Sequence, residues 1–96
     1  MVDDPYVQFR YAVDYFCQLP NNSSALSLTR AFQEVRSEMH NLLDSVDDDA
    51  VIPLQPAGRL IEYVCQSELA SYLLGDESAL PRLRRKVRQA EQLLPG

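Results

Sequence analysis

One segment of the chain carries a regular helical pattern of apolar residues. Between residues 24 and 46, apolar side chains recur at alternating steps of three and four, and most positions between them are polar. This spacing places the apolar side chains on one face of an α-helix. We therefore predict a long helix over 24–46, with a stripe of apolar residues made of Ala25, Leu28, Phe32, Val35, Met39, Leu42 and Val46.

The same periodicity predicts three shorter helices, at about 5–19, 57–74 and 79–94. Asp4 and Pro5 are typical of a helix start, because aspartate caps free N–H groups and proline fits the first turn. The four segments together predict an all-α bundle of four helices in a single domain spanning 1–96. Because the second helix is longer than its neighbours, we expect part of its stripe to be left uncovered within one chain.

The segment 47–56 is predicted to be an extended loop. Three aspartates follow the second helix, where the negative end of its dipole disfavours them, so they indicate an exit from the helix. Pro53 and Pro56 favour an extended backbone in the residues that precede them. Later in the chain, Gly75 is expected to end the third helix in the left-handed conformation that glycine permits.

Composition limits the classes of function. The chain has 96 residues, a formal net charge of −5 and ordinary globular proportions of apolar and charged residues. The N-terminus is acidic where a secretion signal is basic, and no apolar run approaches the roughly 20 residues of a membrane helix. We therefore expect a cytoplasmic protein that does not bind membranes. Cys17 and Cys65 are expected to be buried free thiols.

The residue types needed for catalysis or metal binding are sparse. His40 and Asp44 lie one helical turn apart, but two ligands make a weak metal site without a third. The chain has no glycine-rich phosphate loop, and Asp47, Asp48 and Asp49 lack the alternation of a calcium loop. The sequence thus predicts a protein that is not an enzyme and that has no catalytic residues, no cofactor and no metal.

Glu68 is unusual for its position. It falls near the middle of the apolar face of the third predicted helix, where a carboxylate needs a partner or a raised pKa. We expect an ion pair with an arginine of the fourth helix, although an active-site acid or a position at the edge of the bundle would also fit the pattern.

Several apolar side chains fall outside the predicted core faces. Tyr11 and Tyr15 lie four residues apart on a polar side of the first helix, and Tyr63, Leu73 and Leu74 lie off the apolar centre of the third. Such a group indicates a contact surface, unless every helix of this small bundle is buried over a wide arc.

Residues 82–88, RLRRKVR, carry five positive charges. Residues 1–80 hold thirteen acidic residues and four arginines, a balance of −9. Arg84 and Arg88 flank the apolar stripe of the fourth helix, and they either brace the acidic body or bind an acidic partner. A nucleic-acid role is the alternative. However, the helix-turn-helix motif expects buried aliphatic residues six and nine positions after its glycine, where Pro81 and Arg84 stand.

The sequence thus favours a small acidic protein-binding module of the accessory, adaptor, chaperone or immunity type. It is expected to act through helix–helix contacts with another protein or with a second copy of itself. The alternative is a transcription-associated nucleic-acid-binding protein that uses the basic helix. The predicted protein-binding residues are Tyr11, Tyr15, Tyr63, Leu73, Arg84 and Arg88.

Overall fold

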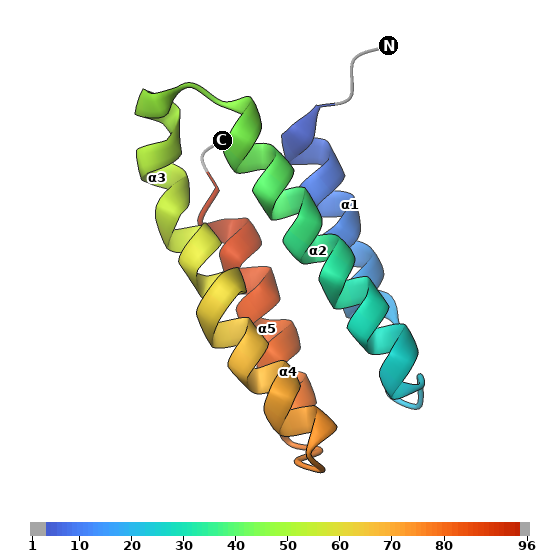
Figure 1. Cartoon of the computed structure of the whole chain (residues 1–96). Coiled ribbons are helices and arrows are strands. Elements are labelled where there is room, and N and C mark those ends of the chain that lie inside the picture. The colour runs from blue at the N-terminus through green and yellow to red at the C-terminus, as the bar shows by residue number, and fades with distance from the viewer. Residues whose placement is uncertain (1–3, 95–96) are drawn as a thin grey trace.

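The first two helices begin at capping side chains. In the computed structural model, which describes residues 4–94, α1 spans Pro5–Gln18 and α2 spans Ala25–Ser45. A side-chain oxygen of Asp4 accepts a hydrogen bond from the Tyr6 N–H at 2.9 Å, and Ser24 Oγ accepts one from the Ser27 N–H at 3.1 Å. The two helices pack along their length as a hairpin (Figure 1). Their bounds confirm the first two predicted helices.

The prediction of an extended loop over 47–56 is wrong. These residues begin α3, which spans Asp48–Arg59. Asp48 and Asp49 lie in its first turn, where the positive end of the helix dipole favours their charges. Pro53 and Pro56 both lie on the exposed side of α3, where water can bind the carbonyl groups that lose their usual N–H donors. The aspartates therefore begin a helix, although the sequence suggested that they follow the end of one.

The third helix of the bundle is consequently long. α3 continues without a break into the π-helix η1, Leu60–Cys65, and then into α4, Gln66–Leu73. Since α3 and η1 both contact α2, they cover the stripe that we expected to be partly free. Within a single chain, five of the seven stripe residues are buried, Val46 is half-buried and only Ala25 is exposed.

The π-helix matches the spacing of buried residues in this long helix. Ala57, Ile61, Cys65 and Leu69 are buried and follow one another at steps of four. On a regular α-helix, each step of four turns the side chain about 40° further round the axis. A π-turn is wider, so it absorbs this drift and keeps the four side chains directed at the core.

The fourth helix, α5, spans Ala79–Gln92 and returns along η1 and α4 to form the second hairpin (Figure 1). Gly75 ends α4 with a φ of 112°, which confirms its predicted role. Its N–H donates to the Tyr72 carbonyl, and the Asp76 N–H donates to the Ser71 carbonyl, both at 3.0 Å. This pair of bonds is the Schellman arrangement, which satisfies the last carbonyls of a helix.

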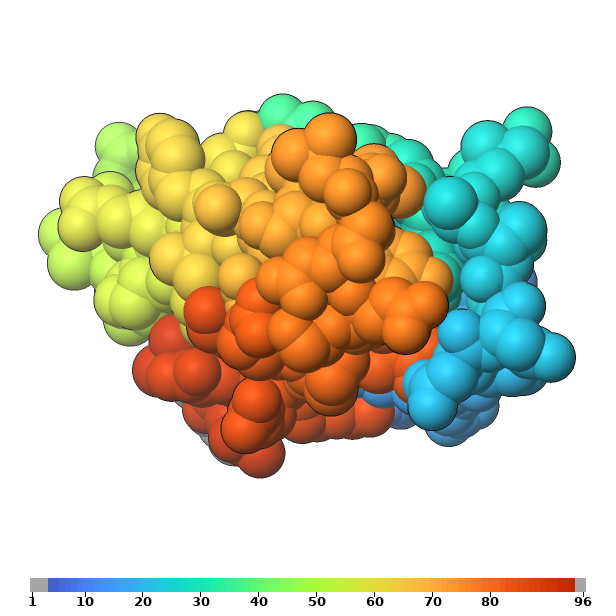
Figure 2. All heavy atoms as spheres, turned by 90° about the horizontal axis from the view of Figure 1, so that it is seen from below, coloured from blue at the N-terminus to red at the C-terminus, as the bar shows by residue number. Residues whose placement is uncertain are grey.

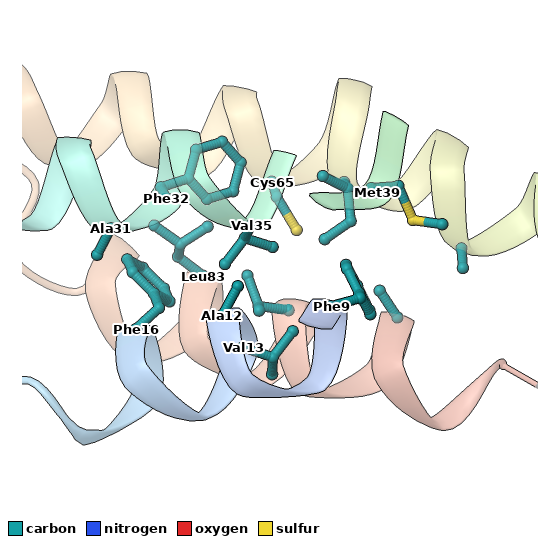
Figure 3. Packing of buried hydrophobic residues seen from close by; sticks show 14 of the residues in the cluster. Phe9, Ala12, Val13, Phe16, Ala31, Phe32, Val35, Met39, Cys65 and Leu83 are labelled. Carbon is teal, nitrogen blue, oxygen red and sulfur yellow. The ribbon is translucent and has the colours of Figure 1, made fainter. Parts of the chain in front are cut away.

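All four helices contribute to one hydrophobic core. Phe9 and Phe16 of α1, Phe32 of α2 and Leu83 of α5 are completely buried, and Figure 3 shows their side chains directed into the same interior. The rings of Phe16 and Phe32 meet edge to face with centroids 6.0 Å apart. The structure is therefore an all-α four-helix bundle, as the sequence predicts.

Candidate protein-binding cleft

Three of the five basic residues in 82–88 form ion pairs within the chain. Arg82 lies 2.8 Å from Glu68 and 3.0 Å from Asp76. Lys86 lies 3.4 Å from Glu68. These contacts hold α5 against α4 and the turn between them, so part of the basic segment braces the acidic body.

Glu68 is the acceptor that Arg82 and Lys86 share. Only 13% of its side chain is exposed, and the expected pairing with an arginine of the last helix is confirmed. The hydrogen bond from Arg82 lowers the pKa of the carboxyl, and Lys86 acts in the same direction. An ionised carboxylate held between two cations is a structural acceptor and not a poised general acid.

Arg88 is the third paired residue and links α5 to α1. Its Nη1 lies 2.6 Å from Asp14 and 3.2 Å from Glu91. The hydrogen bond with Asp14 raises the pKa of the guanidinium above its usual value. Arg88, which we predicted to bind a partner, is therefore engaged inside the chain.

Arg84 and Arg85 differ from these three neighbours. Among residues 4–94, neither forms an ion pair. Nη2 of Arg84 donates to the Leu19 carbonyl at 2.6 Å, while its Nε is buried without an acceptor. A buried donor left without an acceptor costs roughly 1–3 kcal/mol. Two positive charges of α5 thus have no carboxylate partner within the described part of the chain.

The difference between paired and unpaired arginines predicts different effects on stability when their charges are removed. Arg88→Gln should lower the free energy of unfolding by up to about 1 kcal/mol, because it removes a partly exposed link between two helices. Arg85→Gln should leave that free energy unchanged, since the exposed side chain has no partner among residues 4–94. Urea denaturation of the two variants measures the difference, and an equal loss in both would contradict this prediction.

The unpaired arginines line a cleft of about 650 Å³ at one end of the bundle. Cys17 and Asn21 form the side that belongs to α1 and the turn after it, and Arg88 also reaches the cleft. The remaining wall comes from α4, α5 and the turn between them: Tyr72, Glu77, Leu80, Pro81, Arg84 and Arg85. Figure 2 views the molecule from this end and shows the α1–α2 turn, in light blue, beside the orange α4–α5 turn.

The predicted apolar contact residues are exposed but do not gather in one place. Tyr11 and Tyr15 are about two-thirds exposed and, with Val7, form a stripe at steps of four along α1. Tyr63 lies on η1 and lines a separate groove against α2, together with Met39 and Leu43. Tyr11, Tyr15 and Tyr63 are not among the residues that line the cleft.

Leu73 and Leu74 lie at the end of α4, next to the cleft residue Tyr72 in the chain. Leu73 is about half exposed and Leu74 is 90% exposed. Because the turn that follows them contributes Glu77 to the cleft wall, these leucines add apolar surface at the same end of the bundle. Of the predicted set, Leu73, Arg84 and Arg88 therefore lie together at this end.

The sequence reasoning did not single out Arg85, Tyr72 or Leu80 as site residues. Arg85 belongs to the basic segment, but nothing in the spacing separates it from Arg82, which forms ion pairs. Tyr72 and Leu80 carry an ordinary core pattern. The packing of α5 against α4 brings these residues together, and the contact of α5 with α1 closes the other side of the cleft.

The two thiols are free, as predicted, but they differ in burial. Cys65 is fully buried, and burial raises its pKa to about 12. Cys17 is half-buried at the cleft, and burial raises its pKa despite the opposing charges of Arg88 and Arg84. Since the thiolate is the reactive form, both side chains are poor nucleophiles at neutral pH.

His40 pairs with a residue that the sequence did not suggest. Its Nε2 lies 3.1 Å from Glu62 of η1, and the same carboxylate accepts two hydrogen bonds from Arg36, at 2.7 and 3.0 Å. This cluster joins α2 to η1. Within residues 4–94, no three His, Cys, Asp or Glu side chains gather in an arrangement that could hold a metal ion.

The ion pairs of Glu62 predict how the free energy of unfolding depends on pH in acid. The hydrogen bond from Arg36, followed by that from His40, lowers the pKa of Glu62 from 4.5 to about 2. A lowered folded-state pKa contributes stability above pH 4.5 that is lost as the pH falls toward 2. Glu62→Gln should therefore flatten the decline of the unfolding free energy over this range. Denaturant titrations at several pH values measure the slope, and an unchanged slope would contradict the role of Glu62.

Comparisons with known proteins do not assign the cleft. No protein-family model matches the sequence, and neither the comparison with curated proteins nor the comparison with solved structures found a significant match. Separately, none of the helices described in residues 4–94 combines the length and apolar character needed to cross a membrane.

Proposed function

We propose that this protein is a non-catalytic binding module that engages another protein at the cleft between its two helical hairpins. The proposal rests on one observation, which is that only some residues of the basic segment 82–88 form ion pairs within residues 4–94. Arg82, Lys86 and Arg88 have internal carboxylates, whereas Arg84 and Arg85 have none in residues 4–94 and both line the cleft. Unpaired arginines beside apolar side chains are a composition enriched where proteins bind each other.

Four ionisable side chains with shifted pKa values support a structural role for these groups and not a catalytic one. Glu62 and Glu68 are ionised acceptors of internal ion pairs, and the two thiols have raised pKa values. General acid–base or nucleophilic catalysis would need a group whose pKa is adjusted toward neutral pH. The interactions at these four residues move their pKa values away from it.

Site-specific photo-cross-linking tests the binding proposal. The full chain carries a benzophenone amino acid at Leu74, beside the cleft, or at Gln33, an exposed control position on α2. Each version is irradiated in a nuclease-treated lysate of the native organism. A defined protein adduct at Leu74 and none at Gln33 is expected. Identical adduct patterns at the two positions, or none at either, would contradict a partner at this end.

The exposed stripe of α1 supports a second contact, with a further copy of the chain. Self-association through Tyr11 and Tyr15 would bury apolar side chains that are about two-thirds exposed in one chain. Light scattering should then give a dimer for the wild type and a monomer for the double variant Tyr11→Ser/Tyr15→Ser. A strictly monomeric wild type at high concentration would contradict this contact, without bearing on the cleft.

The nucleic-acid alternative receives less support. Three of the five charges in 82–88 are already neutralised by Glu68, Asp76, Asp14 and Glu91. A phosphate backbone gains affinity from many free cations on one surface, and a net charge of −5 opposes its approach. Salt-dependent binding to duplex DNA, lost in Arg84→Glu/Arg85→Glu, would restore this alternative.

A further inference from the structure

The free positive charge at the cleft is small and localised. Arg84 and Arg85 supply two charges, while Glu77 lines the same cleft and Asp14 and Glu91 lie against Arg88. A chain of phosphates entering the cleft would therefore meet carboxylates as well as arginines. One or two isolated negative charges could lie against Arg84 and Arg85 without extending to all of these carboxylates.

The geometry of Arg84 indicates which group would complete the site. Its Nη2 is held by the Leu19 carbonyl, and its Nε is buried with no acceptor among residues 4–94. A guanidinium binds a carboxylate through parallel N–H···O bonds, and Arg84 lines the cleft beside the exposed Arg85. A carboxylate in the cleft would therefore supply the counter-charge that the two arginines lack within residues 4–94.

The other lining residues are suited to an apolar neighbour of that carboxylate. Tyr72, Leu80 and Pro81 line the cleft, and Leu73 and Leu74 extend the apolar surface at the end of α4. A free inorganic anion would leave the exposed part of this surface, at Pro81, Leu73 and Leu74, uncovered. A polypeptide with an acidic residue next to apolar ones would cover it and bind the arginines at the same time.

We infer that the cleft receives an acidic segment of the partner protein, in which a glutamate or aspartate binds Arg84 and Arg85 and an adjoining apolar side chain packs on Tyr72, Leu80 and Pro81. This inference rests on the proposed function and specifies its ligand. The occupant is a protein carboxylate, and nucleic acid is a competing outcome of the test.

The inference is tested with blocked model peptides on the intact, isotope-labelled protein. The probe is acetyl-Leu-Glu-Glu-Leu-amide, and its control is acetyl-Leu-Gln-Gln-Leu-amide. The measurement follows the side-chain N–H resonances of the arginines and the methyl resonances of Leu80 by NMR. We expect the glutamate peptide to shift Arg84, Arg85 and Leu80 in a saturable manner, and the glutamine peptide to leave them unchanged.

Matched variants separate the cleft from general electrostatic attraction. Arg84→Gln/Arg85→Gln should abolish the saturable shifts of Leu80. Arg30→Gln/Arg59→Gln, which removes the same charge from exposed arginines without ion pairs in residues 4–94, should preserve them. The double variant also loses the hydrogen bond between Arg84 and Leu19 and could unfold for that reason. The single variant Arg85→Gln, at an exposed position, avoids this loss. It should weaken binding of the glutamate peptide severalfold.

Three results would overturn the inference. They are equal shifts with both peptides, equal weakening by the two double variants, and stronger saturable shifts with single-stranded oligothymidylate than with the glutamate peptide. The photo-cross-linking experiment remains independent of them. A protein adduct at Leu74 combined with any of these results would uphold a binding module and reject the acidic segment as its ligand.

Discussion

Phe32→Ala is expected to lower the free energy of unfolding by about 3–5 kcal/mol. Phe32 is completely buried on α2 and its ring packs edge to face with Phe16 of α1. Alanine would remove the apolar contacts and leave a cavity in the core. Because domains of this size are stable by only about 5–15 kcal/mol, the loss is a large fraction of the total. Denaturant unfolding followed by far-UV circular dichroism measures it.

Tyr63→Ala is the matched control, because the side chain is aromatic but 70% exposed. Its expected effect is within about 0.5 kcal/mol. Phe32→Leu, which retains most of the apolar volume, keeps the comparison measurable if the alanine variant is already unfolded in buffer. Similar losses for Phe32→Ala and Tyr63→Ala would mean that the core does not lie where the four helices converge.

Glu68→Ala is expected to lower the free energy of unfolding at neutral pH, because it removes the carboxylate that Arg82 and Lys86 share. The substitution leaves Lys86 without an internal carboxylate and leaves Arg82 with Asp76 alone. Because the pKa of Glu68 is lowered in the folded protein, its contribution is present above pH 4.5 and declines as the pH falls below that value. The difference between wild type and variant should therefore shrink in acid.

The control for this effect is Glu77→Ala. Glu77 is exposed and makes no ion pair among residues 4–94, so its loss should change the unfolding free energy by less than about 0.5 kcal/mol. Glu68→Gln keeps the size of the side chain and removes only its charge. A destabilisation of Glu68→Gln no larger than that of Glu77→Ala would show that the ion pairs do not hold α5 in place.

The local pattern of apolar, capping and glycine residues was sufficient to predict much of the fold. The stripe from Ala25 to Val46 predicts α2 to within one residue at each end, because its period and its Ser24 cap agree. Gly75 likewise marks the end of α4, since only its left-handed backbone closes that turn without strain. In both cases the signal lies within a few residues of the feature that it determines.

The start of α3 could not be read in this way. Aspartates between two helical patterns suit the beginning of one helix as well as the end of another, and Pro53 and Pro56 suggested a loop. The structure places both prolines on the exposed side, while Leu54 and Ala57 between and after them are buried. Burial on the opposite side, which depends on the neighbouring helices, decided the conformation.

The candidate site was predictable only in part for a similar reason. The basic segment and Leu73 are visible in the sequence, and the pairing of Glu68 with an arginine of the last helix was expected. Which arginines are paired depends on the packing of α5 between α1 and α4. That arrangement brings Asp14 to Arg88 and leaves Arg84 and Arg85 at the cleft.

Affinity capture with charge-matched variants tests most directly whether Arg84 and Arg85 bind a partner protein. Tagged wild type, Arg84→Gln/Arg85→Gln and Arg30→Gln/Arg59→Gln are each incubated with nuclease-treated lysate of the native organism, and bound proteins are quantified by mass spectrometry. We expect the wild type and the Arg30/Arg59 variant to retain the same stoichiometric protein, and the Arg84/Arg85 variant to lose it. Equal retention by all three, or equal loss from both variants, would contradict a role for the two unpaired arginines of the cleft.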